Sequence, residues 1–370
     1  MFVAEPWRLR RMGSCPLWDR GPVPIAEPEQ LLIVTGVSLS STSLDRTTAG
    51  LPQSAPVGFR VAPIAWARGR LLADSRRMIQ VALGLIWLLD GALQLQSFMY
   101  GRGFIEALTA SAVGQPPWVA DSVNWAARIV QSEQALLNTL FALVQIAIGL
   151  GLLHRRTVRF ALVLSFAWAP LVWWLGEGFG MMLMPMTNPL SGAPGAAILY
   201  VMVGLVVWPG ESPGGLLGLR GARLMWGALW LLMAWLWFAA PGSSPNAISE
   251  TIQGAPSGSG WLTHLQVSLA TLTAGHGLVI GLALAWASIA IGVAVAGNWH
   301  ARAFLCASIV INLVFWVVGQ GFGGILAGGA TDPNTAPLFV LLACALYALT
   351  PLRPRLAGAP ANLLAGDART

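Results

Sequence analysis

Eight apolar stretches recur along this 370-residue chain, and each reaches or approaches the length that a helix needs to cross a lipid bilayer. A hydrocarbon core of about 30 Å takes about 20 mostly apolar helical residues. Only 10% of the residues are charged, whereas soluble domains carry roughly one-quarter. The sequence therefore predicts an all-α integral membrane protein with eight transmembrane helices. The expected spans are residues 79–97, 135–153, 158–176, 193–208, 222–240, 278–296, 303–319 and 336–350.

An internal repeat supports this number of spans. When the chain is aligned with itself at a shift of 143 residues, Gly84 meets Gly227, and the string WWLGEGFG at 173–180 meets WVVGQGFG at 316–323. Since each copy holds four spans, both copies enter the membrane from the same side, which predicts two parallel four-helix repeats. A shift of one further residue aligns Thr187-Asn188-Pro189 with Thr331-Asp332-Pro333.

Arginines are distributed unevenly between the two sides that these spans define. Ten lie in short loops and flanking segments on one side, and only Arg102 and Arg128 lie on the other. The excess of positive charge on the cytoplasmic side of membrane proteins predicts a multi-pass protein of a bacterial inner (plasma) membrane with both termini cytoplasmic. The predicted parts are a disordered tail (1–74), repeat 1 (75–209), a cytoplasmic linker (210–221), repeat 2 (222–352) and a cytoplasmic C-terminal tail (353–370).

Arg77 lies just before the first span, which carries Gly84 and then Gly91. In this pattern each half resembles the DoxX-like family of small four-helix membrane proteins, here as a tandem duplication. Some members are associated with quinone-linked sulfur oxidation, so the resemblance implies a membrane subunit that works with a separate redox subunit. Gln94 and Gln96 occupy the region where the family has a basic residue. No catalytic residue can therefore be carried over.

Asp90 is the outstanding polar residue, because counting from Ile79 places it near the bilayer midplane or just beyond. A charge there costs about 2.5 to 3.5 kcal/mol and usually faces the bundle interior or a water-filled cavity. We expect either a proton or solute site with Gln94 and Gln145 as partners, or a protonated acid that only bonds a neighbouring helix. Met233 is its repeat partner, so either role belongs to the first repeat.

Glu177 and Gln320 occupy the same place in the two glycine-rich strings, at the outer ends of the third and seventh spans. Glycines let the backbone turn tightly, and the acid or amide is then able to cap exposed backbone groups. Alternatively, Glu177 supplies negative charge for a cation or proton in an outer vestibule.

A further candidate site lies in the outer loops, where Asp121 matches His264 and Glu133 matches His276. If the two copies bring these loops together, two carboxylates and two imidazoles share one outer-face site suited to a metal ion. The alternative is that all four are solvated loop residues.

The sequence contains no Walker string, no dinucleotide-binding fingerprint, no HExxH and no basic patch for nucleic acid. It assigns no cofactor, and autonomous catalysis of a familiar type is disfavoured. We expect a protein that binds or moves a small solute or proton through a polar zone in the outer half of the bundle. The alternatives are a membrane subunit of a quinone-linked oxidoreductase and a scaffold for a membrane complex. The lipid bilayer is the expected partner in each case.

Overall fold

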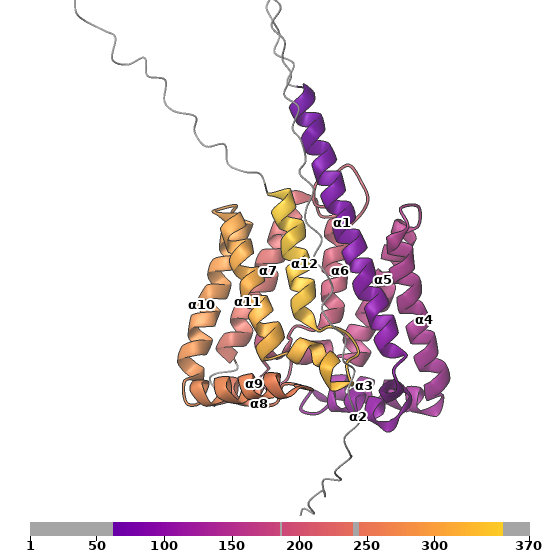
Figure 1. The fold of residues 1–370 in the computed structure, drawn as a ribbon, viewed down its shortest axis with the longest axis vertical. Helices are drawn as coiled ribbons and strands as arrows, with labels where there is room; N and C mark the ends of the chain where they lie inside the picture. The colour runs from indigo at the N-terminus through magenta and orange to yellow at the C-terminus, as the bar shows by residue number, and fades with distance from the viewer. Residues whose placement is uncertain (1–61, 186, 240–243, 351–370) are drawn as a thin grey trace, which may run out of the picture. The chain divides into compact units, whose positions relative to one another are not determined.

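The computed structural model describes residues 62–185, 187–239 and 244–350, which belong to one unit, Arg60–Thr370. Every regular element in these ranges is a helix (Figure 1). The earlier elements are α1 (Ala62–Gln94), η1 (Ser97–Tyr100), α2 (Arg102–Ala110), α3 (Pro117–Ser132), α4 (Gln134–Leu153), α5 (Val158–Leu171), η2 (Val172–Gly176), η3 (Phe179–Met181), η4 (Pro189–Ser191) and α6 (Ala196–Val207). The later elements are α7 (Gly218–Ala239), α8 (Ala247–Gln253), α9 (Gly260–Thr273), α10 (Gly277–Ala296), α11 (Ala301–Val318), η5 (Gly321–Ala327) and α12 (Thr335–Leu349).

Five of these helical segments are long and apolar enough to cross a membrane. Two further apolar helices, α6 and α12, are shorter. The all-α prediction is therefore confirmed for the described residues, and the long apolar helices are compatible with a multi-pass membrane protein. The five segments are Gln134–Leu153, Val158–Gly176, Gly218–Ala239, Gly277–Ala296 and Ala301–Ala327.

The prediction of a disordered tail over 1–74 is wrong at its end, because α1 begins at Ala62. Residues 62–74 are rich in Ala, Leu and Arg, which favour helix, and Pro63 lies in the first turn, where no backbone N–H is needed. In the same way α7 begins at Gly218, within the predicted linker 210–221. The remainder of the predicted N-terminal tail and the C-terminal tail 353–370 lie outside the described residues.

Glycines allow the closest helix contacts. Helix α1 packs against α4, and α7 packs against α10. A Cβ atom added to Gly149 would lie 2.8 Å from the carbonyl oxygen of Gly84, and one added to Gly292 would lie 3.1 Å from that of Gly227. Because small residues let two helix backbones approach each other, these four glycines fix how each pair of helices packs. Contacts of α12 with α6 and with α1 join the earlier and later helices.

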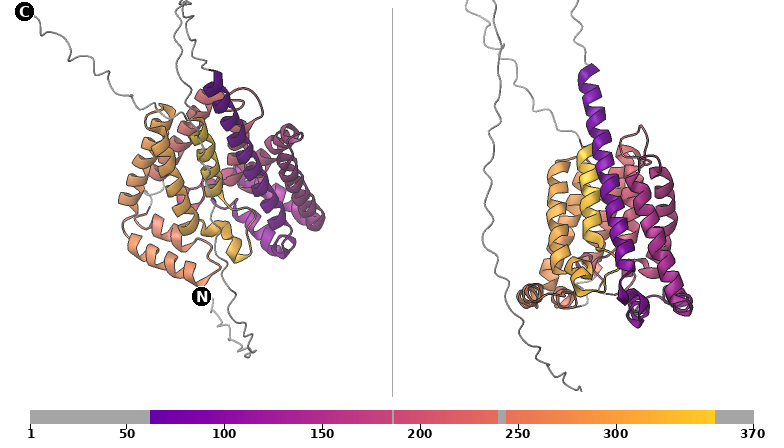
Figure 2. Two further views of the ribbon diagram at one scale, coloured as in Figure 1. Left: turned by 45° about the horizontal axis from the view of Figure 1, so that its top comes forward. Right: turned by 45° about the vertical axis from the view of Figure 1, so that its right-hand side comes forward.

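Four short helices lie across the ends of the long ones. Figures 1 and 2 show α2 and α3, and likewise α8 and α9, at the same end of the bundle and crosswise to it. The indole rings of Trp118 at the start of α3 and Trp261 at the start of α9 are 58% and 57% exposed. Such exposed aromatic side chains suit the boundary between lipid and water.

The two glycine-rich strings form left-handed turns at this same end. Gly178, Phe179 and Gly180 have φ angles of 53°, 59° and 61°, and positions 321–323 have 51°, 57° and 71°. In this unfavourable backbone conformation Phe179 packs against Trp173, with the ring centroids 4.9 Å apart. The turns end the preceding helices abruptly and place Glu177 and Gln320 at the helix ends.

Candidate functional site

Asp90 is buried within the bundle and points toward α6. Its side chain is 3% exposed, and the hydroxyl of Tyr200 donates a hydrogen bond to its Oδ2. Its Oδ1 has no hydrogen-bond partner among the described residues. The position is four residues before the end of α1, about 6 Å along the helix axis. A buried carboxyl with one open oxygen is costly to keep ionised, which marks this position for function.

Neither of the predicted partners forms a hydrogen bond with Asp90. The side-chain amide of Gln94 donates to Oδ1 of Asn138 at 2.5 Å, and that of Asn138 donates to the backbone oxygen of Gln94 at 2.8 Å. This pair ties α1 to α4. Gln145 is buried on α4, and its Oε1 has no partner among the described residues. Sequence reasoning missed Tyr200, although a tyrosine within an otherwise apolar helix was a usable signal.

Glu177 and Gln320 cap the helices that follow them. Oε1 of Glu177 accepts a hydrogen bond of 3.0 Å from the backbone N–H of Ala197, near the start of α6. Oε1 of Gln320 accepts one of 3.2 Å from the backbone N–H of Ala336, at the same place in α12. The capping interpretation is therefore confirmed for both residues, since these bonds satisfy backbone donors that a helix leaves free at its first turn.

The two capping side chains differ in the bonding of their other terminal atom, Oε2 of Glu177 and Nε2 of Gln320. Nε2 of Gln320 donates to the hydroxyl of Thr335 at 3.0 Å. In α6 the corresponding residue is Ala196, and Oε2 of Glu177 has no hydrogen-bond partner among the described residues. A Cβ atom added to Gly195 would lie 2.2 Å from this oxygen, so the glycine makes room for it. Glu177 therefore caps a helix with one oxygen and leaves the other open.

Two indole hydrogen bonds differ from the predicted alignment of Pro189 with Pro333. Nε1 of Trp173 donates to the carbonyl oxygen of Pro194 at 2.7 Å, and Nε1 of Trp316 donates to that of Pro333 at 2.8 Å. In this contact Pro194, and not Pro189, has the same role as Pro333. The difference arises because the loop before α6 is longer than the loop before α12.

A third acid reaches the site from the loop before α12. Asp332 accepts hydrogen bonds of 2.7 Å from the hydroxyl of Thr331 and from the backbone N–H of Asn334. Its charge acts on both Asp90 and Glu177. Nε2 of Gln96 donates to the carbonyl oxygen of Ala330 at 2.5 Å, which ties the same loop to the segment after α1. The later half of the chain therefore supplies a carboxyl to a site in the earlier half.

Burial raises the pKa of Glu177 from 4.5 to about 8, and the negative charge of Asp332 acts in the same direction. Burial also raises the pKa of Asp332, while the bonds from Thr331 and Asn334 lower it. Glu177 thus binds a proton more tightly in the folded protein than in the unfolded chain. Its contribution to stability is complete below about pH 4.5 and is lost as the pH rises to about 8.

Replacing Glu177 with Gln is expected to remove this part of the pH dependence. The amide keeps the cap on Ala197, as Gln320 keeps the one on Ala336, but it does not titrate. Thermal unfolding of the purified protein between pH 5 and 8.5 is the measurement. Wild type should lose stability toward high pH, and the Glu177→Gln variant should lose less. Equal slopes for the two proteins would contradict the assignment.

The four residues of the predicted metal site are separate from this site. Asp121 lies in α3, Glu133 at its end, His264 in α9 and His276 just before α10, and all four side chains are exposed. Within the part of the chain that the structure describes, no group of three or more His, Cys, Asp and Glu residues is arranged to hold a metal ion. The structure does not assemble these four into such a group.

Comparison of the chain with family models, with curated protein sequences and with solved structures gives no match. The resemblance to the DoxX-like family stays a prediction.

Proposed function

We propose that the chain crosses the membrane eight times, as two parallel four-helix copies with both termini in the cytoplasm. The spans are α1, α4, α5 with η2, and α6, followed by α7, α10, α11 and α12. The equal order of elements, the glycine contacts and the paired caps support this proposal. A membrane-impermeant thiol reagent added to intact cells should label Thr263→Cys and not Glu211→Cys, in a background without the native cysteines. The reverse result would contradict this orientation.

In this arrangement of eight spans, the chain binds and moves a proton or a small solute through a polar zone formed by Asp90, Glu177 and Asp332. The observation that carries the proposal is the buried Asp90 carboxyl with its open Oδ1. The charge of Asp332 acts on Asp90 and Glu177, that of Glu177 acts on Asp90, and none of the three acids has a basic partner among the described residues. Buried acids without a basic partner hold protons or attract a cation.

Asp90 is more buried than the other two acids. Asp332 in its loop and Glu177 at its helix end are both partly exposed, whereas Asp90 in α1 is buried. The three residues therefore provide proton-accepting groups both near the outer loops and in the bundle interior. Ionisable residues in such positions are typical of proton relays and ion pathways in membrane proteins.

Flux measurements on the purified full-length chain in lipid vesicles test the proposal. With an imposed membrane potential and a pH-sensitive dye inside the vesicles, the protein should accelerate proton entry beyond that of protein-free vesicles. Parallel vesicles with a sodium- or potassium-sensitive dye test for small cations. Flux at the protein-free level in all three assays would remove the transport proposal.

A further inference from the structure

The chain contains a small cavity around Met233, here called the second chamber, whose lining residues correspond to the surroundings of Asp90. Gly84 in α1 and Gly227 in α7 are the glycines at the helix contacts, and three residues after each of them there is a Trp. Six residues after each glycine there is Asp90 in α1 and Met233 in α7. Both side chains are buried, with 3% exposure each. The acid therefore has an apolar counterpart in an equivalent place.

The partner of Asp90 is replaced in the same way. Counted from the capped residue of each helix, Ala197 in α6 and Ala336 in α12, the third residue is Tyr200 in the first and Phe339 in the second. The phenol that donates to Asp90 thus corresponds to a phenyl ring without a hydroxyl. Both members of the hydrogen-bonded pair are absent from the second chamber.

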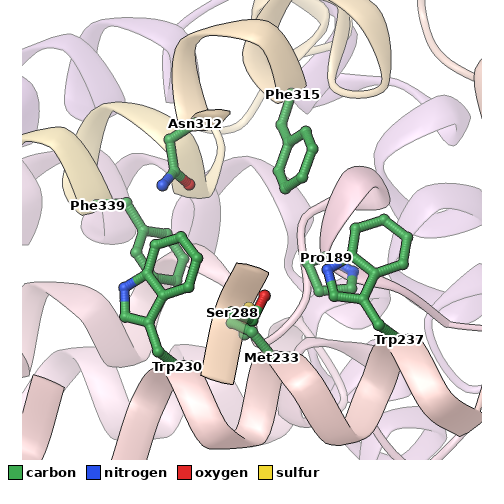
Figure 3. A pocket seen from close by; sticks show the side chains of 8 residues that line it. All are labelled: Pro189, Trp230, Met233, Trp237, Ser288, Asn312, Phe315 and Phe339. Carbon is green, nitrogen blue, oxygen red and sulfur yellow. The ribbon is translucent and has the colours of Figure 1, made fainter. Parts of the chain in front are cut away.

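Figure 3 shows the second chamber, where Met233 lies between Trp230 and Trp237 along α7, and Asn312 and Phe315 face them from α11. The space has a volume of about 10 Å³, roughly enough for one water molecule. The hydroxyl of Ser288 and the amide of Asn312 donate to carbonyl oxygens of their own helices at 2.7 and 2.8 Å. Nε1 of Trp230 has no hydrogen-bond partner among the described residues. The lining contains no titratable group.

The replacement of both Asp90 and Tyr200 by apolar residues in the second chamber has a physical reason. Loss of Asp90 alone would leave the hydroxyl of Tyr200 without an acceptor in a buried place, and loss of Tyr200 alone would leave Asp90 without its donor. Replacing both with apolar side chains leaves neither a carboxyl without its donor nor a hydroxyl without its acceptor. Asp90 and Tyr200 therefore act as one unit that is present or absent as a pair.

The surroundings of Asp90 suit a proton better than a larger ligand. A bound metal cation needs several oxygen ligands, and the described residues contain no group of three or more His, Cys, Asp and Glu that could hold one. Asp90 lines neither the cavity around Met233 nor the cavity at the other end of α1, around Arg76. The titratable groups that act on it are Tyr200, Glu177 and Asp332.

We propose that the carboxyl of Asp90 binds a single proton, with Tyr200 as its positioning residue, and that the second chamber binds none. The inference rests on the proposed function and narrows its ligand to the proton. The proton comes from the carboxyl of Asp332 or from a hydronium ion on that side, where one O–H bond breaks and the oxygen keeps the electron pair. One O–H bond forms at Oδ1 of Asp90, while Oδ2 still accepts the hydroxyl of Tyr200, and release reverses the step.

Infrared spectroscopy of the full-length protein in lipid nanodiscs tests the proposal without any transport assay. The carboxyl C=O band of protonated Asp90 should shift in D₂O, should bleach as the pH rises, and should be absent in Asp90→Asn. Tyr200→Phe should raise the frequency of this band, because the carboxyl of Asp90 loses a hydrogen bond. For the same reason it should shift the pH at which half of the band has disappeared. Tyr347→Phe, which removes a partly exposed hydroxyl from α12, is the matched control and should change neither.

Met233→Asp combined with Phe339→Tyr should add a second titrating carboxyl band. If that double variant does not fold, Tyr200→Phe still decides the matter, because it keeps the aromatic ring. A carboxyl band that does not respond to Tyr200→Phe would overturn the pairing, and no band dependent on Asp90 would overturn the proton site. A band that responds as expected in a protein without flux would leave the proton site in place and remove only transport.

Discussion

Replacing Asp90 with Asn is expected to reduce proton flux in reconstituted vesicles at least about tenfold, because the ionisable group inside the membrane is removed. The amide has nearly the shape of the carboxyl, and its oxygen still accepts the hydroxyl of Tyr200. It has no proton to take up and release. We therefore expect a folded protein with wild-type elution from a sizing column and with flux close to that of protein-free vesicles.

Asp121→Asn is the matched control, because it makes the same chemical change at an exposed position in α3. Its flux should equal that of wild type. If Asp90→Asn transported protons at the wild-type rate while folded, Asp90 would have only a structural role in the bundle. If both variants lost flux, the loss would not be specific to the buried acid.

The helix boundaries that hydrophobicity determines were predictable. The expected spans 158–176 and 135–153 agree with the observed segments Val158–Gly176 and Gln134–Leu153 within one residue. The length of an apolar stretch limits how much helix the hydrocarbon can accommodate, so the sequence carries this information directly. The start of α1 at Ala62 was missed, because a helix that continues beyond its apolar part leaves no hydrophobic signal.

The candidate site was predictable only residue by residue. Asp90 was found from the cost of placing an acid in an apolar helix, and Glu177 from its place in the repeated string. Their neighbours were not found, because Tyr200 reaches Asp90 across 110 positions of the chain and Asp332 arrives from a loop of the other half. Such contacts depend on how helices and loops pack. The alignment offered Asp332 as a counterpart of Asn188 without indicating that it lies near Asp90.

Changing Gly180 to Ala is expected to have the largest effect on folding. The residue has a φ angle of 61°, and a Cβ atom there would lie 2.0 Å from the carbonyl oxygen of Pro194. That oxygen also accepts the hydrogen bond from Trp173, which restrains it from moving away from the added Cβ atom. The left-handed conformation alone costs a non-glycine residue about 1–3 kcal/mol, and the collision adds to this cost. We expect little folded protein and a markedly lower melting temperature in detergent.

Gly260→Ala is the control for the loss of a glycine as such. Gly260 is the first residue of α9, has an ordinary helical conformation, and a Cβ atom there would meet nothing within 4 Å. Because alanine favours helix over glycine, this variant should melt at the wild-type temperature or slightly above it. Wild-type melting of Gly180→Ala would show that the turn after Glu177 is able to move away from Pro194. In that case this contact would not fix the position of Glu177 against α6. The unpartnered Oε2 would then no longer support a role of Glu177 in the site.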